Sequence, residues 1–98
     1  MARFVTERKF EVAGNLTREE LKAIARMFTR ASGETGNGFR WLRAYVTEGG
    51  VLYDCIAEES DQVREHAERV GFGELGSIVE VVAVIGPDTA EDSVREDQ

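Results

Sequence analysis

Residues 39–57 read FRWLRAYVTEGGVLYDCIA, and this stretch decides the fold. Two runs rich in aromatic and β-branched residues flank Glu48-Gly49-Gly50, whose glycines tolerate the positive φ angles of a tight turn. The pattern predicts a β-hairpin with strands over residues 39–47 and 51–57. A hairpin in the middle of a chain needs other elements to cover it, and the flanking sequence supplies them.

The segments on either side of the hairpin each combine one strand with one helix. They are predicted as a strand over 3–10, a helix over 17–31, a helix over 60–70 and a strand over 77–85. Thr17 and Glu20 fit a capping box at the start of the first helix, and Gly71 fits the end of the second. The order β-α-β-β-α-β predicts a ferredoxin-like α+β fold, in which a four-stranded antiparallel sheet carries both helices on one face.

The length and charge of the chain exclude several classes of function. The 98 residues suit one domain, predicted over 1–86, and an acidic tail over 87–98 that we expect to be disordered. Because the net charge is −7, we expect no nucleic-acid partner. No apolar run approaches the roughly 20 residues that span a bilayer, and the start lacks a signal-peptide pattern. We therefore expect a cytoplasmic protein without a membrane partner.

The charge is distributed unevenly along the chain. The net charge is +4 over residues 1–47, −7 over 48–80 and −4 over 81–98. One interpretation is a basic helix beside an acidic helix on the same surface. The other is electrostatic complementarity between subunits, because opposite patches steer association.

Alternation along the strands divides their residues between the two faces of the sheet. An aliphatic set is expected under the helices, namely Leu42, Ala44, Val46, Leu52, Ile56, Val79, Val81, Ala83 and Ile85. The uncovered face is expected to carry Trp41, Arg43, Tyr45, Tyr53, Cys55, Ile78, Glu80, Val82 and Val84. That face is too apolar to remain in water, so we predict that it packs against a second subunit in a two-fold homodimer.

Four residues are candidate ligands for a metal: His66, Asp54, Cys55 and Glu65. His66 lies at the edge of the apolar stripe of the second helix, where a packed, hydrogen-bonded side chain is the alternative. Cys55 is either a soft ligand or a small buried hydrophobe. Asp54 either binds a metal, is turned outward by a bulge, or accepts from backbone and arginine donors. Imidazole, carboxylate and thiolate together suit nickel, copper or zinc.

An alternative function uses a pocket between the sheet and the helices, as in dimeric α+β-barrel proteins. Arg43, Tyr45, Tyr53 and Glu80, together with Trp41, would then bind or act on an apolar or aromatic small molecule. Arg43 and Glu80 can equally pair with each other across the sheet or the dimer interface. No serine has the sequence context of a nucleophile, so the patterns favour a binding protein and leave the question of catalysis open.

Several segments, taken in order, resemble one known family. They are Ala13-Gly14-Asn15-Leu16-Thr17, Trp41 with Tyr45-Val46-Thr47, Arg64-Glu65-His66-Ala67 with Gly71-Phe72, and Ile85-Gly86-Pro87-Asp88-Thr89-Ala90-Glu91. The chain resembles a bacterial family of small ferredoxin-like domains of unknown function that includes nickel-binding proteins. This resemblance implies a dimer, a divalent metal such as nickel, and a metal role for His66. The chain departs from the family pattern where Tyr53 replaces a cysteine, with Cys55 two residues later.

Overall fold

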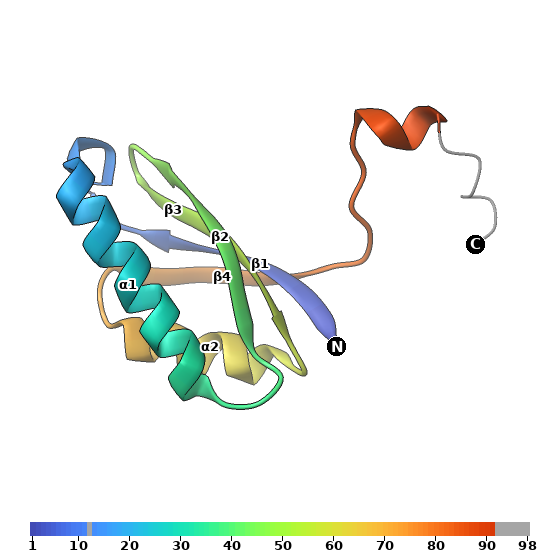
Figure 1. Ribbon diagram of the computed structural model, residues 1–98, viewed down its shortest axis with the longest axis horizontal. Coiled ribbons are helices and arrows are strands. Elements are labelled where there is room, and N and C mark those ends of the chain that lie inside the picture. The colour runs from blue at the N-terminus through green and yellow to red at the C-terminus, as the bar shows by residue number, and fades with distance from the viewer. Residues whose placement is uncertain (12, 92–98) are drawn as a thin grey trace.

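The computed structural model describes residues 1–11 and 13–91. Its elements are β1 (Ala2–Lys9), η1 (Ala13–Asn15), α1 (Arg18–Thr35), β2 (Arg40–Thr47), β3 (Gly50–Ala57), α2 (Ser60–Val70), β4 (Glu74–Val81) and η2 (Pro87–Glu91). Figure 1 shows the strands as one layer with both helices on the same side of it. The predicted ferredoxin-like arrangement is confirmed. No helix of the described residues is long and apolar enough to cross a membrane.

The sheet is antiparallel throughout, with the strand order β2-β3-β1-β4. The inner strands β1 and β3 pair along their whole length, from Ala2 opposite Ala57 to Lys9 opposite Gly50. Gly50 starts β3 directly after the hairpin turn, and a Cβ at this position would lie 2.1 Å from the carbonyl oxygen of Arg8. The close approach of β1 therefore requires glycine here.

The helix ends follow local rules. The Glu20 amide donates to Thr17 Oγ1 at 3.1 Å and the Thr17 amide donates to the Glu20 carboxylate at 2.9 Å, which confirms the capping box. The first helix continues to Thr35, four residues beyond the predicted end, because its last turn buries Ala31 and Thr35. The second helix ends at Gly71, whose φ of 83° is left-handed and whose amide donates to the Ala67 carbonyl.

The core lies between the sheet and the helices and consists of two clusters. One cluster contains Phe4, Phe39, Cys55, Ala57 and Val63. The other contains Phe28, Ala31, Val51, Tyr53 and Val70. The β3 residues in both clusters are odd-numbered. The odd-numbered side of β3 therefore faces the helices.

The predicted assignment of β3 to the two faces is wrong. Tyr53 and Cys55 are buried under the helices, whereas Leu52 is 41% exposed. Alternation alone does not select a face, because both sides of β3 carry apolar residues. One side has Val51, Tyr53 and Cys55, and the other has Leu52 and Ile56. The aromatic ring of Tyr53 fills the space against Phe28, where the ring centroids lie 5.0 Å apart.

The face of the sheet opposite the helices, hereafter the helix-free face, also differs from the prediction in β2 and β4. The register shifts between Trp41 and Arg43, which turns Trp41 toward the helices while Arg43 and Tyr45 stay on the helix-free face as predicted. Glu80 is opposite the buried Phe4 and so lies on the helix side, where it is exposed. By the same register, Val79 and Val81 lie on the helix-free face and not under the helices.

The last strand is displaced from its predicted position. It spans Glu74–Val81, whereas the sequence pattern predicts a strand over 77–85. Val81 pairs with Arg3, and β1 begins at Ala2, so the residues after Val81 have no strand to pair with. Of the predicted disordered tail over 87–98, Pro87–Glu91 forms a 3-10 helix, and the remainder lies outside the described residues.

Candidate functional site

His66 lies in the core, fully buried between the two helices. Its ring stacks on Phe39 with 4.7 Å between the centroids, lies edge-to-face with Phe28 and is tilted against Tyr53. Nε2 lies 3.1 Å from the Phe28 carbonyl oxygen, which only accepts, so Nε2 carries the proton and Nδ1 the lone pair. Burial lowers the pKa of His66, and the hydrogen bond to Phe28 opposes that effect. The imidazole is therefore neutral at pH 7.

A second buried polar residue, Arg8, stands beside His66. Its guanidinium donates to the carbonyl oxygens of Ala67, at 3.0 Å, and of Phe72, and it lies over the Phe72 ring. Ala67 is in the last turn of α2 and Phe72 follows the helix, so the guanidinium lies at the C-terminal end of α2, where the helix dipole favours a cation. The positive charge of Arg8 further lowers the pKa of His66. A metal cation at Nδ1 would meet the same repulsion.

The other three predicted metal ligands lie in separate surroundings. Cys55 is fully buried with Sγ 3.9 Å from the Phe4 carbonyl, and burial raises its pKa to about 12. Asp54 lies on the helix-free face and accepts from Arg3 at 2.6 Å, which is one of the predicted alternatives for it. Glu65 lies at the surface of α2 and pairs with Arg69 at 3.1 Å.

The interior of the chain does not fit a nickel ion. Its only donors of the predicted set are one imidazole lone pair and a thiol that stays protonated, and a guanidinium lies beside the imidazole. Within residues 1–11 and 13–91, no three His, Cys, Asp or Glu side chains come together in a way that would hold a metal. The predicted set of His66, Asp54, Cys55 and Glu65 is thus not assembled within one chain.

A different group of residues with side-chain oxygens lines a hollow at the turn end of the sheet. The short helix η1 packs against β2 and β3, and a hollow of about 240 Å³ opens there. It is lined by Glu11, Gly14, Asn15 and Glu48. A Cβ on Gly14 would lie 2.9 Å from the Cα of Glu48, so glycine lets the two turns approach this closely. We name this site the turn hollow.

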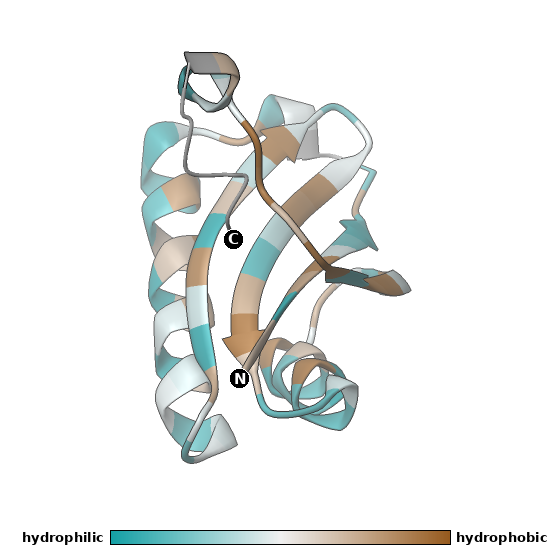
Figure 2. Ribbon diagram, turned by 90° about the vertical axis from the view of Figure 1, so that its right-hand side faces the viewer, coloured by the Kyte–Doolittle hydropathy of each residue, from teal (hydrophilic) through white to brown (hydrophobic). Residues whose placement is uncertain are grey.

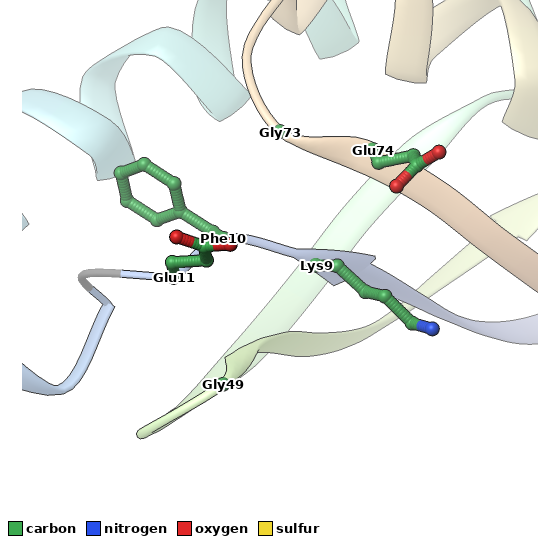
Figure 3. Close-up of a pocket in the computed structure, with 6 residues that line it drawn as sticks. All are labelled: Lys9, Phe10, Glu11, Gly49, Gly73 and Glu74. Carbon is green, nitrogen blue, oxygen red and sulfur yellow. The ribbon is translucent and has the colours of Figure 1, made fainter.

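The turn hollow adjoins a larger open groove of about 700 Å³. The groove is lined by Lys9, Phe10, Glu11, Gly49, Gly73 and Glu74. Figure 3 shows the Lys9 side chain extending away from Glu11, with Glu74 on the neighbouring strand. Glu11 therefore lines both spaces, and the Lys9 ammonium is directed away from it. Two carboxylates and one carboxamide in the turn hollow make an oxygen donor set that suits a divalent cation.

Sequence reasoning missed Glu11, Asn15 and Glu48 because each stands in a turn, where polar residues are ordinary. The signal that could have found them is the juxtaposition of two turns, and only the tertiary structure supplies it. Arg8 was missed as well. Arg8 follows Phe4 and Thr6 at alternate positions of β1, which places all three on the buried side of the strand. This spacing indicates a charged residue in the core.

A further cavity, hereafter the cleft, lies between α1 and β2 and holds about 310 Å³. It is lined by Leu21, Ile24, Ala25, Phe28, Trp41, Leu42, Arg43, Ala44, Val46 and Val51. The indole N–H of Trp41 is buried and has no acceptor among the described residues. Of the predicted pocket residues, Trp41 and Arg43 thus meet at one cavity, while Tyr53 lies in the core and Tyr45 on the helix-free face.

Comparison with known proteins places the chain in a family. Residues 4–81 match the model of the family described as "Nickel responsive protein SCO4226-like". The chain belongs to this SCO4226-like family. The match to the SCO4226-like model ends at Val81, the last residue of β4. The resemblance to a bacterial family of small domains with a nickel connection is confirmed at the level of the family.

One solved structure supports the fold. The crystal structure of SCO4226 from Streptomyces coelicolor A3(2) superposes with a TM-score of 0.70 at 15% identity, covering 86% of this chain and 100% of that chain. At this identity the likeness shows the fold alone. No curated protein matches the sequence significantly.

Proposed function

We propose that the protein is a homodimer that binds a divalent transition ion, with nickel as the first candidate, in the turn hollow. The nickel-responsive family name points to the ion. The observation that supports this site is the meeting of Glu11, Asn15 and Glu48 around one small hollow. The net charge of −7 favours cations over anions at the surface. A cytoplasmic location stays a prediction.

The chemistry of the donor set limits what the hollow can select. Carboxylate and carboxamide oxygens accept hard divalent ions, which keep several water ligands. Among first-row ions, affinity for a given oxygen or nitrogen site rises from manganese through cobalt to nickel. The turn hollow is therefore expected to prefer nickel to manganese through affinity rather than through geometry.

Calorimetric titration of the tag-free full chain with Ni²⁺ and Mg²⁺ tests this proposal. Glu48→Gln removes one carboxylate of the hollow and is expected to weaken Ni²⁺ binding at least about tenfold, because a charge-assisted ligand is lost. Glu65→Gln is the matched control, since Glu65 already pairs with Arg69 on α2. Absence of Ni²⁺ binding to the wild-type chain, or equal weakening in both variants, would contradict the proposal.

The cleft favours a second candidate function, the binding of a small apolar molecule. Its walls are mostly apolar, and its volume of about 310 Å³ is at the lower end for ligand pockets. The carrying observation is that the rings of Phe28 and Trp41 line the cleft among aliphatic side chains, a lining that an apolar or aromatic molecule would fit. This candidate assigns no reaction.

Tryptophan fluorescence tests the cleft directly, because Trp41 is the only tryptophan of the chain. Titration with a small aromatic ketone such as acetophenone should give a saturable change in emission. Ala25→Leu, which narrows the cleft, should remove that change, whereas Met27→Leu on the exposed side of α1 should not. A linear, unsaturable response in the wild-type chain would exclude a cleft site for this class of ligand.

A further inference from the structure

Residues 82–91, hereafter the arm, leave the body of the molecule after β4. Figure 1 shows the arm extending away from the sheet and ending in η2. Val82, Val84 and Ile85 are 95%, 66% and 79% exposed. The side-chain hydrogen bond recorded for the arm is local, from the Gly86 amide to Thr89 Oγ1 at 2.8 Å. The end of the arm thus forms the 3-10 helix η2, whereas the side chains of its apolar part are exposed to solvent.

The sequence of the arm is unsuited to solvent. Residues 81–85 read VVAVI, an unbroken apolar run. Such a run is typical of a strand that is covered on both faces. In a strand with one solvent-exposed face, apolar and polar residues alternate. In the single chain residues 82–85 of this run are exposed. Its composition therefore indicates a cover that one chain does not provide.

The helix-free face offers an apolar surface next to the arm. Tyr45, Leu52 and Val79 on that face are 57%, 41% and 56% exposed. In Figure 2, which looks onto this side of the sheet, the arm stands in front of the strands and is coloured hydrophobic along its first part. Val79 and Val81 of β4 run directly into the arm, so the face and the arm form one continuous apolar strip.

The helix-free face and the arm carry exposed charges of opposite sign. Arg40 and Arg43 are exposed on the edge strand β2, and their register partners Ile56 and Asp54 place both on the helix-free face. Asp88 is exposed on η2 at the far end of the arm. The arm therefore combines an apolar stem with an acidic end, and the helix-free face combines apolar side chains, the Arg3–Asp54 ion pair and a basic edge on β2.

We infer that the arm is a clasp between two copies of this chain: the apolar stem of one arm lies on the helix-free face of a second copy, with its acidic end beside Arg40 and Arg43 of that copy. Two-fold symmetry repeats the contact, so each chain gives one arm and receives one. The arm lies beyond residues 4–81, the range that matches the family model. The inference rests on the proposed dimer and is independent of the proposed ion site.

Sedimentation velocity of the full chain over a range of concentrations tests the clasp. The wild-type chain is expected to be a dimer. Val84→Asp places a carboxylate in the apolar stem and is expected to weaken the dimer at least about tenfold. Met27→Asp makes the same chemical change at an exposed methionine of α1 and should leave the dimer unchanged. Circular dichroism checks that each variant is folded.

A charge exchange tests which surface receives the arm. Arg43→Glu should weaken the dimer by repelling Asp88, and combining it with Asp88→Arg should restore part of the loss. A wild-type chain that is monomeric at all concentrations would overturn both the dimer and the clasp. A stable dimer that Val84→Asp does not weaken would leave the dimer in place and overturn the clasp alone. A loss of folding stability in Val84→Asp with an unchanged dimer would show the arm folding back on its own chain, which also overturns the clasp.

Discussion

Nε2 of His66 donates a hydrogen bond of 3.1 Å to the carbonyl oxygen of Phe28, and this bond ties α2 to α1. Residue 28 would normally give its carbonyl oxygen to the amide four residues later, and the imidazole shares that oxygen. The only histidine of the chain is thereby a neutral donor in the core. This role explains why a residue predicted as a metal ligand is packed between aromatic rings.

Stability should fall at acidic pH because of His66. Its pKa is lowered in the folded state, mainly by burial, below the unfolded value of 6.5. Above pH 6.5 both states are neutral and stability is constant. Below pH 6.5 the unfolded chain binds a proton that the folded chain does not, so stability falls by about 1.4 kcal/mol per pH unit until the folded pKa is reached.

Urea unfolding at pH 7.5, 6.0 and 5.0 measures this dependence. In His66→Gln the chain has no histidine, so the loss between pH 7.5 and 6.0 should disappear while the amide can still donate to Phe28. The slope in the wild-type chain should exceed that of the variant in this interval. Parallel curves for the two proteins would show that folding does not lower the pKa of His66.

Cys55 should be inert in the folded protein. Burial, with a smaller contribution from the charge of Asp54, raises its pKa to about 12, and the thiol is fully buried. Because thiolates are the reactive form, iodoacetamide at pH 8 should modify the native chain only through unfolding. The labelling rate should rise steeply at urea concentrations near the unfolding midpoint. Fast labelling of the native chain by mass spectrometry would contradict the buried position.

The pair of Arg3 and Asp54 should contribute to stability through one well-made ion pair. Their atoms lie 2.6 Å apart, with side-chain exposures of 37% and 11%. Arg3→Met leaves a mostly buried carboxylate without its donor and should cost about 1–2 kcal/mol. Combining it with Asp54→Asn should cost less than the sum of the single changes. A fully additive double-mutant cycle in urea unfolding would mean that the pair does not interact.

Two glycines should respond to alanine in opposite directions. A Cβ on Gly33 meets nothing within 4 Å, and the residue lies inside α1, so Gly33→Ala should stabilise the fold by about 0.5–1 kcal/mol. A Cβ on Gly14 would lie 2.9 Å from the Cα of Glu48, so Gly14→Ala should destabilise the fold and weaken ion binding in the turn hollow. Thermal unfolding and Ni²⁺ titration measure both effects. A neutral Gly14→Ala would show that the two turns do not touch.

The element order followed from local signals. The capping box at Thr17, the glycine turn before Val51 and the left-handed stop at Gly71 each depend on a few neighbouring residues. The end of β4 did not follow from them, because it depends on where β1 begins. Residues 82–85 have strand composition, but no partner strand lies beside them in one chain.

The faces of the sheet could not be derived from alternation alone. Both parities of β3 carry large apolar residues, and Asp54 alone marks the parity of Leu52 and Ile56 as the outer one. The choice of Tyr53 over Leu52 for the core depends on the ring of Phe28 in a distant helix. In β2 the register shift after Trp41 reverses the pattern within one strand. The turn hollow was hidden for a similar reason, because Glu11 and Glu48 are far apart in the sequence and meet only after β1 and β3 have paired.

Paramagnetic line broadening by Ni²⁺ in the ¹⁵N–¹H spectrum tests the central claim most directly, because the ion itself marks its position. At a substoichiometric amount of Ni²⁺, we predict that the amide signals of Gly14, Asn15 and Gly49 disappear first, around the turn hollow. The same amount should leave the amides of Phe28 and His66 sharp. Broadening centred on His66 and Phe28, with the turn signals unaffected, would contradict the account and return the metal to the interior of the chain.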